Sequence, residues 1–427
     1  MRHLYTLLTL LALPLIFARL WWRGRRNDDY RQRWGERLGR YGFASTAERC
    51  VVFHAVSVGE LHGAMPLLEA FLGKHPQIPV VVTTTTPTGS SRVRLLLGKR
   101  ARHVYLPYDL PWCVDGFLRQ FNPQLLVLLE TELWPNLLHV CHQHQCQVLL
   151  VNARLSPKSF ASYQHIAGLT RVMLQQLALV SAQTSADGER FVQLGLPAQH
   201  LAVNGSLKFD IAVQQEKLSA ARITKAGWQR PVWIAASTRQ GEDALILTIH
   251  KQMLAKIPDL LLVLVPRHPE RFRSAQEKAI ARGLACVKQS SQPVVTADTQ
   301  VLVGDTLGDM HFYYGLADVA FVGGSLVPSG CQNIVEAAAI GLPVVTGPSL
   351  FNFQAASEAL RAAGAMLVVA DASELGQVVV ELLQNPERRQ MMAQQAKAVV
   401  AANIGATDRT LEVIERYCLD LTVSAID

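Results

Sequence analysis

The 427-residue chain is 49% hydrophobic, which suits two folded domains and excludes a disordered, fibrous or disulfide-stapled protein. Of its 41 basic and 34 acidic residues, ten Arg and four acids lie in residues 1–49, which therefore carry nearly all of the net charge of +7. Basic residues beside an apolar segment favour a membrane surface, whereas nucleic-acid binders usually carry theirs on a folded domain. The seven irregularly spaced cysteines indicate reduced thiols in a cytosolic setting.

The N-terminal segment is uncharged and rich in Leu from Leu4 to Phe17, and Arg19 then separates this run from a Leu-Trp-Trp triplet. The run is shorter than the roughly 20 residues of a comfortable span, but snorkelling of Arg19 extends it. A signal peptide would need a small-x-small cleavage site and its positive charge on the other side. We therefore expect a membrane-anchor helix, either spanning the bilayer or lying in its interface, with residues 27–427 on the cytoplasmic face.

Beyond a basic, helix-like stretch at 31–37, apolar runs rich in Val and Leu alternate with amphipathic segments. Unbroken apolar strands separated by helices predict parallel sheets that are covered on both faces. The predicted strands are 50–56, 80–84, 125–129, 147–151, 179–183, 232–235, 260–265, 300–303, 319–322 and 344–346.

A polar stretch at 210–230 interrupts this alternation and marks a domain boundary. No G-x-G-x-x-G or P-loop motif follows a strand, which disfavours simple dinucleotide or P-loop chemistry. The predicted organisation is a membrane anchor (1–26), an N-terminal Rossmann-like domain (27–212), a linker (213–230), a C-terminal Rossmann-like domain (231–405) and a C-terminal helix (406–427).

The first predicted strand is followed by Ser57-Val-Gly-Glu60, so Glu60 lies in the first turn of a helix at the carboxyl end of a strand. Ligands of such folds bind at this end of the sheet, which makes Glu60 a candidate general base. The alternative is a structural acid that the helix dipole favours. A useful base would need burial to raise its pKa toward neutrality.

Two further candidates lie in the first domain. A buried strand runs directly into Glu130-Thr131-Glu132, so we expect at least one carboxylate to face the cleft, unless both are exposed turn acids. Lys208 lies near the domain boundary, where it is either a point charge for a phosphate or carboxylate or a solvated linker residue. The acceptor pocket is loosely placed near 57–66 and 83–90, although the Thr run in the latter also suits a strand end and helix cap.

In the second domain, Arg267 and His268 present cations after the strand 260–265, unless this is a solvated basic loop. Asp305 and Asp309 follow another strand, but their spacing in a Gly-bearing loop is weak evidence for a metal pair, and we expect no metal.

The Gly-rich segment 323–333 leads into a helix, and the free N–H groups at this start predict an anion site. Asn333 and Glu336 fit a capping pattern, and the glutamate alternatively grips ribose hydroxyls. A cluster of possible metal ligands lies on a probable helix and lacks the C-x-x-C pairs of a zinc site: His139, Cys141, His142, His144 and Cys146.

Taken together, these segments resemble the Kdo (3-deoxy-manno-octulosonic acid) transferases of the lipid A pathway. The resemblance runs from Arg31-Gln-Arg-Trp-Gly-Glu36 to Gly347-Pro-Ser-Leu-Phe-Asn-Phe353, with the intervening motifs in the family's order. The set is specific, although each motif alone is weak. The intervening motifs are 54–61, 130–136, 204–210, 266–272, 304–308 and 323–327.

The resemblance implies a metal-independent GT-B glycosyltransferase that moves Kdo from CMP-Kdo to the tetraacyl disaccharide lipid A precursor in lipopolysaccharide biosynthesis, at the bacterial inner membrane. It implies that Glu60 is the base and that Glu130 and Lys208 stabilise the transition state. Cations and a helix N-terminus suffice to hold a monophosphate leaving group, so no cofactor is expected, nor a nucleic-acid partner. The implied CMP-binding positions are Arg267, His268, Leu307, Gly308, Asp309, Asn333, Ile334, Val335 and Glu336.

One departure from the family pattern concerns the donor site. Many members have Gly-Gly-His-Asn where this chain has Gly330-Cys-Gln332-Asn333, so a charge-switchable side chain is replaced by a neutral one. Two other hypotheses stay open at this point: a UDP-sugar transferase or epimerase on the same fold, and a non-catalytic, membrane-tethered nucleotide-binding protein. The joint presence of Glu60, Glu130 and Lys208 argues against the second.

Overall fold

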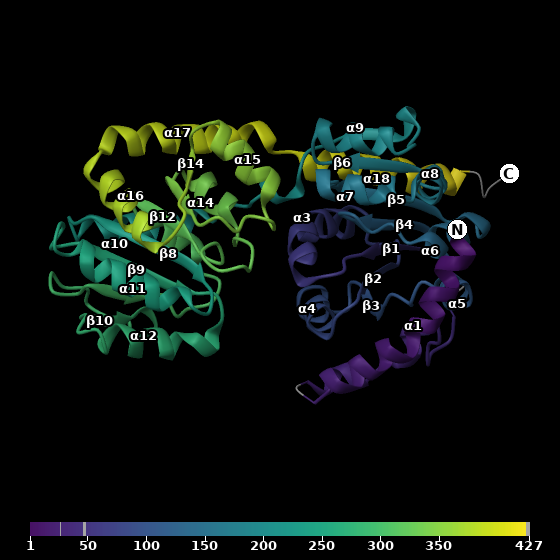
Figure 1. Ribbon diagram of the computed structural model, residues 1–427, viewed down its shortest axis with the longest axis horizontal. Coiled ribbons are helices and arrows are strands. Elements are labelled where there is room, and N and C mark those ends of the chain that lie inside the picture. Colours follow the sequence, from purple (N-terminus) through teal and green to yellow (C-terminus); the bar gives the residue numbers. More distant parts are fainter. Residues whose placement is uncertain (26, 46–47, 424–427) are drawn as a thin grey trace. The chain divides into compact units, whose positions relative to one another are not determined.

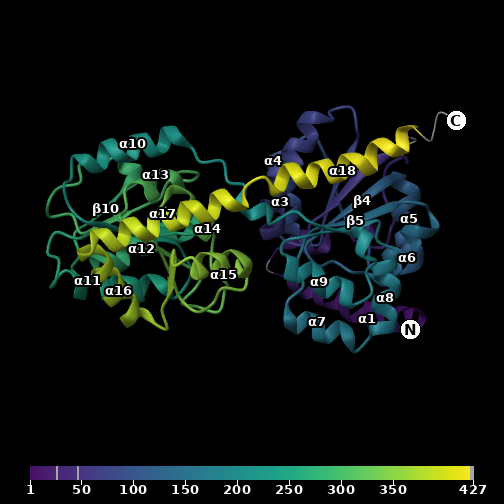
Figure 2. The same ribbon diagram turned by 90° about the horizontal axis from the view of Figure 1, so that it is seen from above.

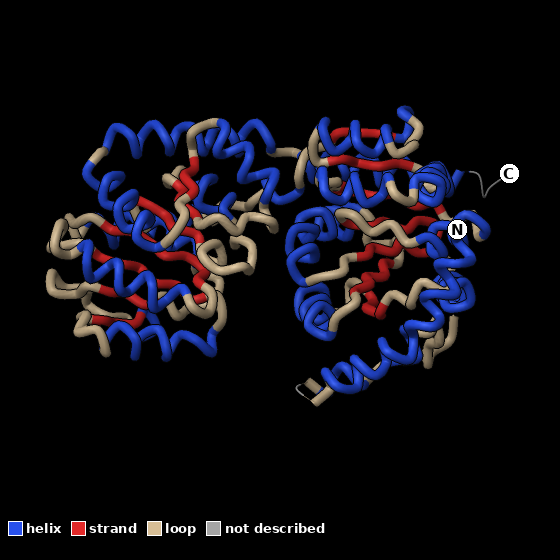
Figure 3. The backbone as a smooth tube through the Cα atoms, in the orientation of Figure 1, coloured by secondary structure: helices blue, strands red, loops and turns tan. Residues whose placement is uncertain are grey.

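The computed structural model describes residues 1–25, 27–45 and 48–423 and contains two compact units. Unit 1 comprises Met1–Asp210 together with the chain from Gly405 onward, and unit 2 comprises Ile211–Ile404 (Figure 1). Each unit holds a seven-stranded parallel sheet with helices packed around it (Figure 3). The predicted α/β class with two Rossmann-like domains is confirmed.

Unit 1 begins with α1 (Arg2–Arg23), η1 (Asp28–Arg31) and α2 (Trp34–Arg37). Its remaining elements are β1 (Cys50–His54), α3 (Val58–Lys74), β2 (Val80–Thr84), α4 (Pro87–Leu97), β3 (Arg102–Tyr105), α5 (Pro111–Phe121), β4 (Pro123–Leu129), α6 (Pro135–Gln143), β5 (Gln147–Ala153), α7 (Pro157–Gln164), α8 (Ala167–Gln175), β6 (Leu179–Ala182), α9 (Ser185–Gln193), η2 (Ala198–His200), β7 (Leu201–Val203), η3 (Leu207–Phe209) and α18 (Ala406–Val423).

The unit 1 sheet has the strand order β3-β2-β1-β4-β5-β6-β7. Successive strands are added toward one edge from β1 to β3 and toward the other edge from β4 to β7, so the order reverses between β1 and β4. All seven residues of β4 are buried, and their alternation supplies two cores. Leu126 and Leu128 pack with Phe117 and Phe121 of α5, whereas Leu125, Val127 and Leu129 pack with Leu67 and Phe71 of α3. Burial on both faces explains why this strand is apolar without interruption.

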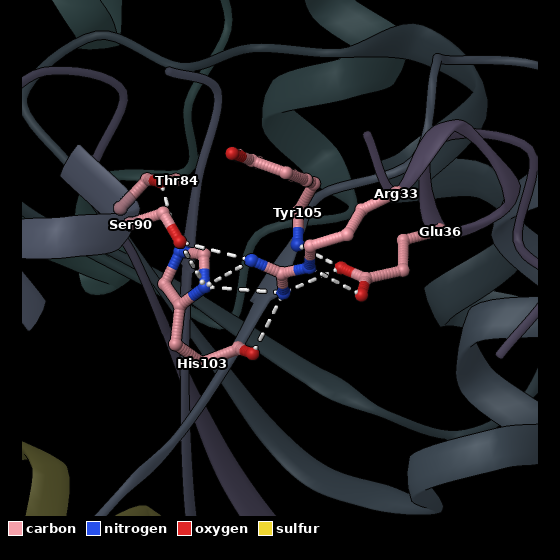
Figure 4. Close-up of polar contacts among 6 residues, drawn as sticks. All are labelled: Arg33, Glu36, Thr84, Ser90, His103 and Tyr105. Carbon is pink, nitrogen blue, oxygen red and sulfur yellow. Dashed lines mark hydrogen bonds and ion pairs between the residues drawn. The ribbon is translucent and has the colours of Figure 1, made fainter. Parts of the chain in front are cut away.

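Arg33, in the segment after α1, makes polar contacts with residues at the edge of the sheet (Figure 4). Its backbone has a left-handed φ of 57°. Its guanidinium donates to both carboxylate oxygens of Glu36, at 2.7 and 2.8 Å, and to the Ser90 hydroxyl at 2.9 Å. Glu36 also accepts from the Tyr105 N–H at 2.9 Å. Burial, followed by the charge of Arg33, lowers the pKa of His103 in this network to about 3, so the imidazole is neutral.

The chain returns to unit 1 at α18, which packs on α3 and β4 (Figure 2). The carboxylate of Asp210 accepts the N–H groups of Gly405 and Thr407 at 2.7 and 2.5 Å. Asp210, the last residue of the first segment of unit 1, therefore caps the N-terminus of α18. The expected separate C-terminal helix is therefore part of unit 1, and its predicted residues 424–427 lie outside the described residues.

Unit 2 has the sheet order β10-β11-β9-β8-β12-β13-β14, and this order reverses between β8 and β12. Its elements are α10 (Gln215–Ala226), β8 (Val232–Thr238), α11 (Glu242–Met253), β9 (Leu261–Pro266), η4 (Pro269–Arg271), α12 (Phe272–Ile280), β10 (Cys286–Lys288), η5 (Gln289–Ser291), β11 (Val301–Val303), α13 (Met310–Gly315), β12 (Val319–Val322), α14 (Ile334–Ile340), β13 (Val344–Thr346), α15 (Gln354–Ala362), β14 (Met366–Val368), α16 (Ala372–Gln384) and α17 (Pro386–Asn403).

The expected linker at 213–230 is wrong for most of its length, because α10 forms there and packs on α13 within unit 2. Leu218 and Ala221 are buried by this packing, although the rest of the helix is polar. A helix with only a narrow apolar stripe has a weak hydrophobic pattern, which explains why the sequence suggested a loop. The first segment of unit 1 ends at Asp210 and unit 2 begins at Ile211, whereas the sequence predicted that the first domain ends at 212 and the second begins at 231.

Candidate functional site

Glu60 lies at the carboxyl end of β1, in the first turn of α3, where the sequence placed it. Its Oε1 accepts the Ser57 hydroxyl at 2.9 Å and its Oε2 accepts the Val56 N–H at 2.8 Å. Ser57 in turn accepts the Glu60 N–H at 3.2 Å, so the acid also serves in a helix cap. Burial, and next the charge of Glu130, raises the pKa of Glu60, while these donors oppose the rise. The carboxylate is thus held in one orientation and is a stronger base than a solvated one.

Lys208 and Glu130 form an ion pair, with 2.9 Å between Nζ and Oε1. The two groups come from residues 78 apart in the chain, and the Lys208 side chain lies within 3.6 Å of where a Cβ on Gly63 of α3 would be. Glu130 follows β4 with a left-handed φ of 61°, a conformation that is uncommon outside Gly and Asn. The three predicted residues Glu60, Glu130 and Lys208 are therefore brought together at the switch point of the unit 1 sheet.

Asn152 positions Lys208 and was missed in the sequence. Its side-chain oxygen accepts the Leu207 N–H at 3.1 Å, and its own backbone has a φ of 51° at an irregularity between β5 and β6. Leu207 and Phe209 on either side of Lys208 are buried, which fixes the short 3-10 turn. An Asn in a strand-like run, Val151-Asn152-Ala153, was the available signal.

Glu132 is a third carboxylate of this site. Burial raises its pKa to about 7, and the charges of Glu60 and Glu130 contribute. It accepts the Trp134 indole N–H at 2.7 Å. The two carboxylates of the Glu-Thr-Glu segment, of which we expected at least one to face the cleft, thus lie in different environments. Glu130 is paired with a cation, whereas no described cation pairs with Glu132.

A second set of contacts reaches Glu60 from α2, the helix that contains Arg37. Arg37 donates to the Thr85 carbonyl at 3.0 Å, and the Thr85 hydroxyl donates to the Val56 carbonyl at 3.0 Å. Val56 is the residue whose N–H binds Glu60. The Thr run at 83–86 therefore does more than end a strand and cap α4, because it orients the residue that holds the candidate base.

In unit 2, Arg267 and His268 follow β9 as expected. The Nε of Arg267 donates to Gln332 Oε1 at 3.1 Å. Gln332, which stands where many family members have His, therefore binds a cation. The Nη1 of Arg239 lies 2.7 Å from His268 Nε2. Because a guanidinium only donates, Nε2 is the acceptor, and burial, with Arg239 next, lowers the pKa of His268. His268 is consequently a neutral imidazole.

Asn333 caps α14 by accepting the Val335 N–H at 3.0 Å, and its amide donates to Glu336 Oε1 at 3.0 Å. Burial raises the pKa of Glu336, and Arg267 contributes in the opposite direction. The side chains of Ile334 and Val335 are buried, so only their backbone groups are available to a ligand. Asn333 therefore caps α14 as the capping pattern predicts, whereas Glu336 binds the side-chain amide of Asn333 instead of its backbone N–H.

The Leu307–Asp309 loop is held by Lys217 of α10, which donates to the Gly308 carbonyl and pairs with Asp309, both at 2.8 Å. Leu307 is 73% exposed and free of core packing. Asp305 instead accepts the N–H and hydroxyl of Ser290. The two aspartates thus have separate partners, and the described residues contain no group of three or more His, Cys, Asp or Glu arranged to hold a metal ion.

The predicted anion site comprises the Gly-rich segment and the start of α14, and in the turn of the Gly-rich segment a carboxylate of the protein already binds the N–H groups. Glu242 is fully buried and accepts the N–H groups of Gly324, Ser325 and Leu326 at 2.7, 3.1 and 3.0 Å. A row of N–H groups in a Gly-rich turn does attract an anion, but here the anion is internal. The N–H groups of this turn are therefore not free to bind an external anion.

Comparison with known proteins agrees with this geometry. Residues 32–211 match the family described as 3-deoxy-D-manno-octulosonic-acid transferase (kdotransferase). The chain is 40% identical to the 3-deoxy-D-manno-octulosonic acid transferase of Bordetella pertussis, covering 97% of this chain and 99% of that one, and 38% identical to that of Haemophilus influenzae, covering 97% and 98%. A glycosyltransferase structure from Rickettsia africae has a similar fold, with a TM-score of 0.56 at 12% identity over 87% of this chain and 99% of that one.

The two Rossmann-like units, each with charged residues at its switch point, have a GT-B-like fold. The identities of 38% and 40% to two Kdo transferases, over 97% of this chain, show that the chain belongs to the Kdo transferase family of glycosyltransferases.

Glu132→Gln is expected to stabilise the protein at alkaline pH. The ordinary pKa of 4.5 rises to about 7 on folding, so the folded protein binds more protons than the unfolded chain between these values. Stability therefore falls as pH rises through this window, and a side chain that cannot ionise avoids the loss. The gain in free energy of unfolding should grow by on the order of 1–3 kcal/mol from pH 5 to pH 8, measured by chemical denaturation. The exposed Glu189→Gln is the control, and a gain independent of pH would contradict the assignment.

Proposed function

We propose that the chain transfers Kdo from CMP-Kdo to the tetraacyl disaccharide precursor of lipid A. Family membership supports the reaction class, and the observation that carries the assignment of roles is Glu60, oriented by two hydrogen-bond donors beside the Lys208–Glu130 pair. A carboxylate that is half-buried, fixed and raised in pKa suits proton abstraction from a sugar hydroxyl.

In the proposed reaction, Glu60 removes the proton of an acceptor hydroxyl as its oxygen attacks the anomeric carbon of Kdo. The bond from that carbon to the phosphate oxygen breaks, and CMP leaves with the electron pair, so one displacement inverts the anomeric centre. Lys208 stabilises negative charge that develops during the transfer, and Glu130 holds its ammonium in place. Unit 2 supplies the donor contacts through Arg267 and the 307–309 and 333–336 segments.

We further propose that α1 attaches the protein to the cytoplasmic face of the inner membrane by lying in the interface. By length and composition, α1 is the helix among the described residues that is suited to a membrane. Arg2 and Thr6 near its start bind Asn136 of α6, and Phe17 near its end packs on Tyr108, so both ends contact unit 1. The exposed large apolar side chains of α1 form a broad surface that suits contact with lipid, and they are Leu4, Leu7, Leu8, Leu10, Leu11, Leu15, Trp21 and Trp22.

The interfacial arrangement predicts that the N-terminus stays on the cytoplasmic side. An epitope tag on Met1 should resist an added protease in intact spheroplasts and be cleaved once the membrane is permeabilised. A helix that spans the bilayer would instead expose the tag in intact spheroplasts, because the Arg-rich end at 23–26 favours the cytoplasm.

Glu60→Gln is expected to lower Kdo transfer by about 10²–10⁴-fold, because the amide keeps the shape of the side chain but cannot accept the proton. The product lipid is detected by mass spectrometry after incubating the detergent-solubilised protein with CMP-Kdo and the disaccharide acceptor, which also counts the sugars added. CMP affinity should be unchanged. Glu69→Gln on the exposed face of the same helix is the matched control. Full transfer by the Glu60 variant would rule out its role as base.

The proposed reaction needs no metal ion, because cations of the protein meet the charge of a monophosphate leaving group. Transfer should therefore continue at the wild-type rate in EDTA. Activity lost in EDTA and restored by Mg²⁺ would overturn this proposal and return attention to Asp305 and Asp309.

A further inference from the structure

A group of arginines lies at the carboxyl ends of β8 and β9 in unit 2, beside the neutral His268. Arg239 follows β8, and Arg267 and Arg271 follow β9. These strands adjoin the point at which the sheet order reverses, between β8 and β12. In open parallel sheets this is where ligands bind. Arg239 lies outside the sequence motifs that predicted the donor site.

The backbone at Arg239 is fixed in an irregular conformation. Ser237 has a left-handed φ of 53°, and the register of β8 with β9 shifts between Ala236 and Thr238. The Arg239 N–H donates to Glu242 at 2.7 Å, and its carbonyl accepts from Arg271 at 3.0 Å. A local bulge of this kind redirects the side chains that follow it, and the contacts on both sides of the peptide leave Arg239 little freedom.

The Arg239 guanidinium is partly desolvated, and no carboxylate among the described residues lies at hydrogen-bond distance from it. Its Nη1 donates to the neutral imidazole of His268, and its Nε is buried with no hydrogen-bond partner there. The nearby Glu242 is fully occupied by backbone N–H groups. Removing a cation from water without an anion is costly.

The two neighbouring arginines have different side-chain partners. Arg271 is paired with Asp243, and Arg267 donates its Nε to the neutral Gln332. Two guanidiniums, those of Arg239 and Arg267, thus have positive charge that no described side chain neutralises at hydrogen-bond distance. They follow strands that lie about 4.8 Å apart. The site is therefore suited to a ligand with two anionic groups close together.

We propose that Arg239 binds the carboxylate of the donor sugar acid while Arg267 faces the phosphate. This rests on the proposed function, in which the donor is CMP-Kdo. In that donor the carboxylate and the phosphate oxygen are attached to the same anomeric carbon, so the two anions must be met by adjacent cations. Gln332 holds Arg267 beside the Asn333 cap, which is the nucleotide side, and leaves the carboxylate to Arg239. A planar guanidinium pairs with a carboxylate through two parallel hydrogen bonds.

The test compares a ligand that has the carboxylate with one that lacks it. Arg239→Gln should raise the KM for CMP-Kdo about 10–100-fold, the effect of losing a charged hydrogen bond. The Kd of CMP, measured by calorimetry, should stay within about twofold. Arg239→Lys keeps the charge without the fork and should show an intermediate KM. Arg267→Gln should weaken CMP and CMP-Kdo together.

The exposed Arg273→Gln, whose wild-type side chain pairs with Glu277 on the surface of α12, is the control for a lost positive charge. An unchanged KM for CMP-Kdo in Arg239→Gln would overturn the proposal, and so would an equal loss of CMP and CMP-Kdo binding. CMP binding also verifies that the variant is folded. If the wild-type protein itself transfers no Kdo, the proposed function fails and this proposal with it, whereas normal wild-type transfer with either contrary result refutes the role of Arg239 alone.

Discussion

The reversal of strand order, between β1 and β4 in unit 1 and between β8 and β12 in unit 2, is the constraint on which both candidate sites depend. On either side of such a reversal the helices leave to opposite faces of the sheet, so the loops at the strand ends diverge and expose backbone and side chains between them. Glu60 and Glu130 follow the two strands at one reversal, and Arg239 and the Gly-rich segment follow the two strands at the other. Residues far apart in the chain thereby become neighbours without any special local motif.

Three buried or half-buried carboxylates show how similar side chains are used for different purposes at these loops. Asp210 and Glu242 have their oxygens filled by backbone N–H groups, and they stabilise the return of α18 and the Gly-rich segment. Glu60 also accepts a backbone N–H and a hydroxyl, but its pKa is raised by burial and by the charge of Glu130. Asp210 and Glu60 each accept two hydrogen bonds, so the number of donors alone does not distinguish a structural carboxylate from a candidate base, and the raised pKa is what marks Glu60 for chemistry.

Much of this arrangement was predictable from sequence, because it depends on strong, local patterns. The buried strand 125–129 and the position of Glu60 three residues after a capping Ser57 are both visible in the amino-acid order. Lys208 was predicted from its place near a boundary, but its partner was not, since the pairing with Glu130 depends on the register of β4 with β5 and on the Asn152 contact to Leu207. The helix at 215–226 was missed because only Leu218 and Ala221 face a neighbour.

The anion site was the least predictable feature, and the reason is physical. A Gly-rich turn and a helix start have the same appearance in sequence whether their N–H groups are free or already bonded, and only the fold brings Glu242 beneath Gly324 and its neighbours. Because the protein supplies its own anion to this turn, an incoming phosphate or carboxylate has to be bound by other groups, and the nearby arginine side chains are suited to this. Arg239 and Arg267 are the cations left with unneutralised charge at that edge of the sheet, and Gln332 adds a hydrogen-bond acceptor without adding a charge that would cancel theirs. A neutral residue at position 332 is therefore consistent with a donor site in which charge recognition belongs to arginine.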